Sequence, residues 1–263
     1  MPRANRHYIP GCVWHITHRC HEKSFLLKFA KDRKQWLHWL FEAKKRYALS
    51  ILNYMVTSNH VHLLVYDISG QDIISKSIQL VAGRTGQQYN QRKRRKGAFW
   101  EDRYHATAVE HGAHLFRCLV YIDLNMVRAS VVNHPCEWPF SGYNEIQEPR
   151  QRYALIDYEK LSYLLGIKSY AQLKETHRRW VEASLVSRTN SREHKWTESI
   201  AVGSRHFIED TKSKLGVRAS GRMFREANGV YELREPRSSY SADFGHKNDA
   251  LSSENTYFWN VYL

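Results

Sequence analysis

Cysteine and long apolar runs are scarce in this chain, and both scarcities limit what it can be. Four cysteines in 263 residues, with no CxxC pair, are too few and too scattered for a disulfide framework. We therefore expect reduced thiols and a cytoplasmic protein. The charge-free stretch 48–66 carries polar residues and a short turn, which predicts two buried strands and weighs against a membrane span. The amino terminus lacks the apolar run of a signal peptide.

Acidic residues are scarce in the first part of the sequence. Residues 1–100 hold 18 Lys and Arg against 5 Asp and Glu, whereas residues 101–263 hold 22 against 21. Most of the net charge of +14 therefore lies in the first hundred residues. A surplus of this size indicates a polyanionic partner, which would meet that part of the chain.

The hydrophobic content of 42% is enough for a folded core, and its periodicity predicts the order of elements. We expect strands over 13–19, 49–56 and 61–66, a short hairpin over 98–109, and helices over 32–47, 73–90 and 114–129. This order predicts an α+β domain with one antiparallel sheet and its helices packed on one face.

A run of Pro and Gly between positions 135 and 149 marks a domain boundary. We therefore predict a first domain over 1–148 and an accessory helical region over 149–237. The polar stretch that follows predicts a flexible tail over 238–263.

His60 and His62 flank Val61 in a predicted strand. Side chains at i and i+2 of a strand point to the same face, so the two imidazoles can converge on one metal ion. A second candidate, the Cys12–His21 segment, holds five possible zinc ligands. Its alternating pattern predicts a strand that sends those side chains to opposite faces, which weighs against a zinc site.

The helix predicted over 114–129 carries a polar stripe on an otherwise apolar surface. At about 100° per residue, the stripe spans an arc of about 80° and consists of His114, Arg117, Tyr121, Asn125 and Arg128. A surface tyrosine on an amphipathic helix is one interpretation. The other is chemical: a tyrosine hydroxyl can attack phosphorus, the arginines can hold phosphates, and the Asn125 oxygen can complete the shell of Mg²⁺ or Mn²⁺.

A run of five cations precedes three aromatic residues. Interleaved cations and rings suit single-stranded nucleic acid, because phosphates pair with the cations and bases stack on the rings. With the arginines of the polar stripe, the candidate DNA contacts are Arg92, Lys93, Arg94, Arg95, Lys96, Trp100, Arg103, Arg117 and Arg128.

The order of these motifs resembles one known family. The segment 59–64 (NHVHLL) resembles the His-hydrophobic-His motif of single-tyrosine HUH transposases, and 121–129 (YIDLNMVRA) resembles the tyrosine helix of REP-associated tyrosine transposases. Three further segments resemble the same group: 14–17 (WHIT), 99–104 (FWEDRY) and 138–143 (WPFSGY). The family commonly has Pro at the position of Met126. Methionine is the better helix former, so we expect the helix geometry to be kept.

The resemblance implies a ferredoxin-like catalytic domain with a helical carboxy-terminal extension. It implies that His60 and His62 bind Mg²⁺ or Mn²⁺, with Asn125 as third ligand. Tyr121 would attack a phosphodiester in a palindromic single-stranded DNA hairpin, leaving a 5′-phosphotyrosine link and a free 3′-hydroxyl. Members of the family act as monomers or as homodimers.

Two other functions remain open at the level of sequence. A non-catalytic DNA-binding regulator derived from a transposase would bind the same hairpin without forming a covalent adduct. An RNA-processing enzyme would discriminate through the 2′-hydroxyl. The complete set of His60, His62, Tyr121 and Asn125 favours the strand-transferring enzyme, since binding alone has no need of it.

Overall fold

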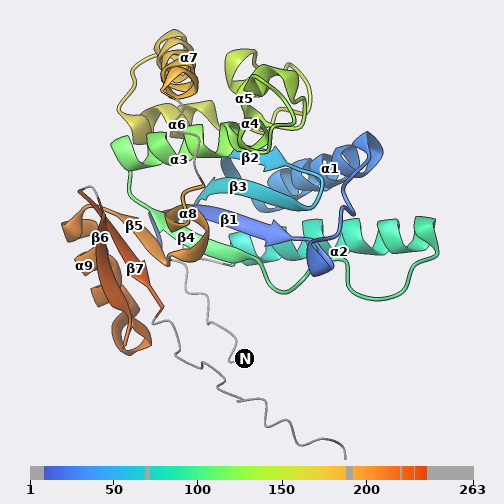
Figure 1. Cartoon of the computed structure of the whole chain (residues 1–263), viewed down its shortest axis with the longest axis horizontal. Coiled ribbons are helices and arrows are strands. Elements are labelled where there is room, and N and C mark those ends of the chain that lie inside the picture. The colour runs from blue at the N-terminus through green and yellow to red at the C-terminus, as the bar shows by residue number, and fades with distance from the viewer. Residues whose placement is uncertain (1–8, 69–71, 188–191, 220, 228, 236–263) are drawn as a thin grey trace, which may run out of the picture.

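The computed structural model describes residues 9–235 apart from 69–71, 188–191, 220 and 228 (Figure 1). Its strands are β1 (Val13–Arg19), β2 (Ser50–Val56), β3 (His60–Tyr66), β4 (His105–Val109), β5 (Ala201–Gly203), β6 (Met223–Ala227) and β7 (Val230–Arg234). Its α-helices are α1 (Ala30–Tyr47), α2 (Ile73–Lys93), α3 (Ala113–Asp123), α4 (Asn125–Arg128), α5 (Gly142–Gln147), α6 (Tyr158–Leu165), α7 (Tyr170–Val186), α8 (Lys195–Glu198) and α9 (Arg205–Leu215). Short 3₁₀ turns lie at His21–Lys23, Pro135–Glu137 and Gly216–Ala219. No helix in the described ranges is long and apolar enough to cross a membrane.

A single sheet of described strands organises the molecule, in the order β2-β3-β1-β4-β5-β7-β6. Every neighbouring pair is antiparallel except β4 and β5. Because alternate residues of an antiparallel strand face opposite sides, each strand presents one set of side chains to each face. The predicted α+β class with a mainly antiparallel sheet is confirmed.

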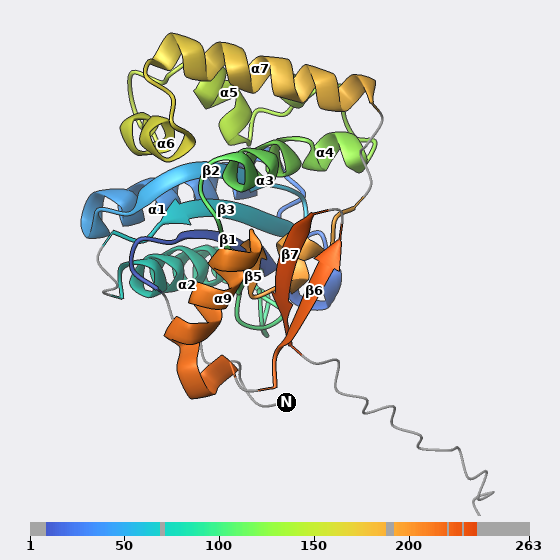
Figure 2. The same ribbon diagram turned by 90° about the vertical axis from the view of Figure 1, so that its left-hand side faces the viewer.

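Helices cover both faces of this sheet, whereas the sequence analysis placed them on one. Ile16, Val61 and Leu63 face Trp36 of α1 and Ile78 of α2. Figure 2 shows α2 below the sheet, with α3, α5, α6 and α7 stacked above it. The physical reason lies in β2, whose seven residues are all buried and which therefore needs cover on both sides.

Three predicted elements differ from the structure. The 98–109 segment is no hairpin: only β4 is a strand there, and it pairs with β1 and β5. The helix predicted over 114–129 is interrupted at Leu124. The region after 149 adds strands β5, β6 and β7 to its helices. The predicted tail, 238–263, lies outside the described residues.

A buried polar network ties α7 to the end of α3. The Asp123 carboxylate lies 2.7 Å from His177 Nε2 and accepts a 3.0 Å hydrogen bond from Asn53 of β2. Gln147 meets the other His177 nitrogen at 2.9 Å. A Cβ on Gly142 would come within 2.1 Å of the Asn53 side-chain oxygen, so only glycine lets α5 begin this close to β2. The network fixes the helix end that follows Tyr121.

We predict that His177→Ala lowers the free energy of unfolding by about 3–5 kcal/mol, because it leaves the Asp123 carboxylate buried without its partner. Arg179→Ala is the matched control two residues along, where an exposed arginine is expected to cost about 0.5 kcal/mol or less. Urea denaturation of both variants measures the difference. Equal effects would mean that the network adds nothing to stability.

Candidate active site

His60 and His62 both project from β3 toward the face of the sheet that carries α3. Their ring centroids lie 4.9 Å apart, so the predicted pair is formed. The Asn59 side chain donates to the Lys23 carbonyl, which turns its oxygen toward His60 Nδ1 at 2.7 Å. His60 Nδ1 therefore carries the hydrogen, and its Nε2 keeps a lone pair.

A third histidine, His15 of β1, lies beside this pair. Its Nε2 is 2.9 Å from His62 Nδ1, and its Nδ1 is 2.8 Å from the carbonyl oxygen of Trp196. The rings of His15 and His62 are stacked at 5.1 Å. His18, three residues along the strand, stacks instead on Trp100 at the opposite face. The Cys12–His21 segment thus sends its histidines to opposite faces, as predicted.

Tyr121 lies near the end of α3, facing the histidines. Its ring centroid is 6.2 Å from that of His62 and 6.3 Å from that of His15. The side chain is 6% exposed, so it is not the open surface tyrosine that an amphipathic helix would give. Burial raises the pKa of its hydroxyl, and the positive charge of Arg128 opposes that rise.

Arg128 covers Tyr121 from the other side. Its guanidinium carbon lies 4.0 Å from the centre of the Tyr121 ring, and its Nη2 donates a 2.7 Å hydrogen bond to the Tyr121 carbonyl oxygen. Carbonyls in the last turn of a helix need such outside donors. Arg128 thereby holds both the ring and the backbone of the tyrosine.

Asn125 lies one turn after Tyr121, and its side chain reaches His62. Leu124 has φ −78° and ψ 4°, which ends α3 and starts the short helix α4 at Asn125. The Asn125 amide nitrogen then lies 3.0 Å from His62 Nε2. The predicted grouping of His60, His62, Tyr121 and Asn125 is thus one continuous cluster.

The donor set of this cluster fits a divalent cation. His60 and His62 are each hydrogen-bonded through Nδ1. Each Nε2 therefore carries the lone pair that a metal ion can bind. Asn125 presents its oxygen to the same space after a flip of its amide. Within the described ranges, no three His, Cys, Asp or Glu side chains form a ligand group.

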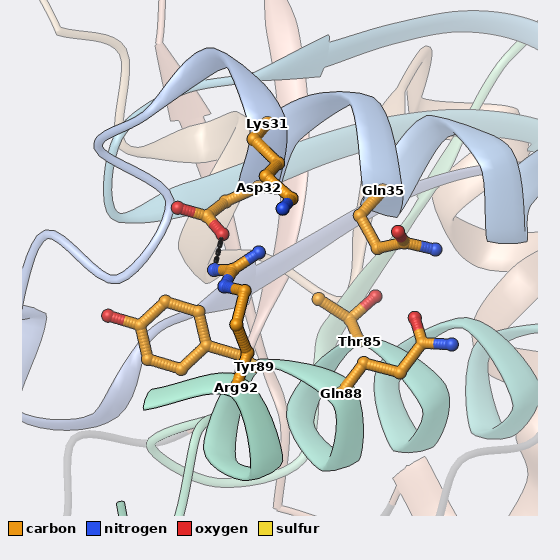
Figure 3. Close-up of a pocket in the computed structure, with 7 residues that line it drawn as sticks. All are labelled: Lys31, Asp32, Gln35, Thr85, Gln88, Tyr89 and Arg92. Atoms are coloured by element: carbon orange, nitrogen blue, oxygen red, sulfur yellow. Dashed lines mark hydrogen bonds and ion pairs between the residues drawn. The ribbon is translucent and has the colours of Figure 1, made fainter. Parts of the chain in front are cut away.

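The basic run predicted for DNA binding lies at the end of α2. Arg92 forms an ion pair with the buried Asp32 of α1, beside a pocket of about 120 Å³ between the two helices (Figure 3). Lys93 Nζ lies 5.4 Å from the ring of Phe29. Arg94 ends the helix with a left-handed φ of 49°. Four of its five members are exposed, namely Arg92, Lys93, Arg94 and Lys96.

The chain returns from this run to the same end of the sheet as His60. Cys20, just after β1, forms a bridge with Trp100, while Arg19 pairs with His60 in the β1–β3 ladder. The Trp100 indole donates to the Ala82 carbonyl, so its ring is fixed against α2. Arg103 is exposed nearby in the sequence, whereas Arg117 is exposed on α3, one turn before Tyr121. Among the candidate DNA contacts, the structure thus brings Arg128 to the cluster, whereas the basic run ends α2, the helix on the opposite face of the sheet (Figure 2).

Sequence reasoning missed two members of the cluster. His15 was considered only as one of the five possible zinc ligands of the Cys12–His21 segment and as part of the WHIT segment. Trp196 lies in a region predicted to be accessory, yet its carbonyl meets His15 and its ring centroid is 6.2 Å from that of Tyr121. The pairing of His15 with His62 could have been found from the β1–β3 register, but nothing local in the sequence marks Trp196.

The three histidines are kept neutral by burial. It lowers the pKa of His15 to about 3 and that of His60 to about 4, and it also lowers the pKa of His62. An unfolded chain would instead protonate each of them near pH 6.5. Their contribution to stability is therefore complete above pH 6.5 and is lost as the pH falls toward 4.

We predict that the metal-free protein loses about 1–2 kcal/mol of unfolding free energy per buried histidine between pH 7 and pH 5. Urea denaturation in the presence of chelator measures the loss. His15→Phe should make the pH dependence shallower, because one proton fewer is taken up on unfolding. An unchanged slope would show that His15 titrates alike in both states.

Part of this chain is similar to known proteins. The family model described as "Transposase IS200 like" matches residues 8–125. Among solved structures, a REP-associated tyrosine transposase bound to a REP hairpin is 20% identical, with a TM-score of 0.48, over 60% of this chain and 95% of that chain. A protein from Deinococcus radiodurans R1 assigned as a transposase is 15% identical, with a TM-score of 0.31, over 39% of this chain and 82% of that chain. Comparison with curated proteins gave no match.

The family match covers both histidines of β3, Tyr121 and, at its last residue, Asn125. It therefore confirms the resemblance that the motifs carry. Residues 8–125 of this chain are similar to the IS200-like transposases.

Proposed function

We propose that this protein cleaves and rejoins single-stranded DNA at palindromic hairpins through a covalent link to Tyr121. The observation that carries the proposal is the convergence of Tyr121, His62 and Asn125: the two rings are 6.2 Å apart and the amide is 3.0 Å from His62. A protein that only binds DNA needs no such cluster. The hairpin as substrate class follows from the resemblance of the motifs.

Tyr121 is the proposed nucleophile. Its hydroxyl oxygen would attack the phosphorus of a phosphodiester, form an O–P bond and release the 3′ oxygen as a hydroxyl, with the phenolic proton balancing the proton gained by the leaving group. The product is a 5′-phosphotyrosine link. The released 3′-hydroxyl reverses the step on the same or another strand end, so no external energy source is required.

His60, His62 and Asn125 are the proposed ligands of a divalent cation, Mg²⁺ or Mn²⁺. When bound, such an ion polarises the scissile phosphate and stabilises the leaving oxygen. The protein's own contribution is to hold both imidazoles neutral and each Nε2 available. Their lowered pKa values support this role, because a protonated imidazole cannot bind a metal.

Arg128 and the basic run are the proposed phosphate contacts. Arg128 lies over the Tyr121 ring, where a guanidinium can hold a phosphate next to the scissile one. The run from Arg92 to Lys96 joins the His60 end of the sheet through the Cys20–Trp100 bridge. A strand whose scissile phosphate lies at Tyr121 would have to pass around that end of the sheet to reach these cations.

Tyr121→Phe should abolish adduct formation and leave hairpin affinity within a few fold, because only the attacking oxygen is removed. The assay uses end-labelled single-stranded DNA from the palindromic repeats that flank the gene, incubated with Mn²⁺ and run on a denaturing gel. Tyr163→Phe, at an exposed tyrosine of α6, is the matched control and should behave as wild type. A covalent band that persists in Tyr121→Phe would place the nucleophile elsewhere.

His60→Ala should lose the adduct in the same assay while hairpin affinity stays within a few fold, since one imidazole ligand is missing. Chelator added to the wild type should give the same result. His206→Ala, at an exposed histidine of α9, serves as control. Cleavage that survives both the substitution and the chelator would remove the metal from the mechanism.

The same experiments separate the other two functions. Tight hairpin binding by the wild type without any adduct would indicate a DNA-binding regulator. Stronger binding of the RNA version of the hairpin than of the DNA version would indicate an RNA-processing enzyme, because the 2′-hydroxyl is the difference between them.

A further inference from the structure

The hydrogens of the buried histidine chain can be placed from one fixed point, the carbonyl oxygen of Trp196. A carbonyl only accepts, so His15 Nδ1, at 2.8 Å, must donate to it. His15 is fully buried, and a second hydrogen would leave an imidazolium there beside another histidine, which low polarity disfavours. His15 Nε2 is therefore an acceptor.

The same reasoning carries on to His62. Its Nδ1 lies 2.9 Å from the accepting Nε2 of His15 and so must carry the hydrogen. His62 Nε2 then holds a lone pair, and the Asn125 amide nitrogen meets it at 3.0 Å as a donor. Both neighbours of His62 thus specify one tautomer, with the hydrogen on Nδ1.

This tautomer is the one that His62 needs in order to bind a metal ion through Nε2. Free imidazole side chains in water favour the hydrogen on Nε2, which would block that nitrogen. Histidines that bind a metal generally donate their other N–H to an outside acceptor, and that acceptor sets the tautomer and the ring orientation. For His62 the acceptor is His15.

The fixed point is itself held in place by β4. Thr107 donates to the Ser199 carbonyl at 2.6 Å and to the Trp196 carbonyl at 3.2 Å. Trp196 is fully buried, so α8 is anchored against the sheet on the side that carries His15. The acceptor comes from a residue outside the 8–125 family match.

We propose that His15 is a positioning residue: held by the Trp196 carbonyl, it accepts the Nδ1 hydrogen of His62 and so keeps His62 Nε2 free for the metal ion. This inference rests on the proposed function, because it assigns a role toward that ion. It also gives the region after residue 149 a part in the active site. Removing the acceptor should let the hydrogen of His62 move from Nδ1 to Nε2, which would weaken metal binding.

The first test reads the tautomer directly, without metal or DNA. Nitrogen-15 NMR of the imidazole rings in the metal-free protein at pH 7.5 should show His62 with its hydrogen on Nδ1. In His15→Phe, which keeps a planar ring but has no acceptor, the hydrogen should move to Nε2. In His15→Gln, the side-chain oxygen can accept from His62, so the wild-type pattern should return.

The second test measures Mn²⁺ affinity from the free-ion signal in electron paramagnetic resonance. His15→Phe should bind Mn²⁺ about 10–100-fold more weakly than wild type, the usual effect of losing an acceptor behind a metal-bound histidine. His15→Gln should recover most of that loss. His206→Phe, the same replacement at the exposed histidine of α9, should leave the affinity unchanged.

The outcomes distinguish this proposal from the function on which it rests. His62 with its hydrogen on Nε2 in the wild type, or a tautomer and affinity unchanged in His15→Phe, would overturn the role of His15 even if the protein cleaves DNA. The expected tautomer shift without any Mn²⁺ binding would refute the metal site instead. Should His15→Phe fail to fold, the wild-type tautomer and the His15→Gln affinity still decide.

Discussion

The register of β1 against β3 is the constraint on which the site depends. It pairs Thr17 with His62 and His15 with Leu64, so His15 and His62 point to one face and come within hydrogen-bond distance. A shift of one residue would turn every side chain of β1 to the other face. His15 would then leave the cluster, and Trp14 or Ile16 would lie opposite Leu64 in its place. The hydrophobic residues that alternate with these histidines fix the register, because they must remain against α1 and α2.

The sequence was sufficient to predict those parts of the site whose residues lie close together within one strand or helix. His60 and His62 share a face because they are two apart in a strand, and Tyr121 and Asn125 share one because they are four apart in a helical segment. The α+β class followed in the same way from periodicity. What could not be read locally was set by distant partners: the break at Leu124, the burial of Tyr121 under Arg128, and the approach of Trp196 across 181 positions to His15. The strands β5, β6 and β7 were missed because five residues or fewer carry little periodicity.

Burial shifts the pKa of the histidines and that of the tyrosine in opposite directions. The same loss of water that lowers the pKa of His60 and His62 raises that of Tyr121. The imidazoles are thus ready to bind a cation at neutral pH, while the phenol is held in its unreactive form. A positive charge beside the hydroxyl is then needed to restore its reactivity, and Arg128 supplies part of it. In the proposed reaction, the tyrosine would therefore stay inert until substrate and cation are both present.

The position of Trp196 in the chain also has a consequence for the order in which the site is completed. A ribosome delivers β1, β3 and α3 well before α8, so a nascent chain can assemble the histidine pair and the tyrosine while the acceptor for His15 is still missing. The last hydrogen bond of the cluster forms only when the segment around Trp196 docks on β4. A chain that stops before Trp196 therefore has His60, His62 and Tyr121 but lacks the carbonyl that His15 contacts.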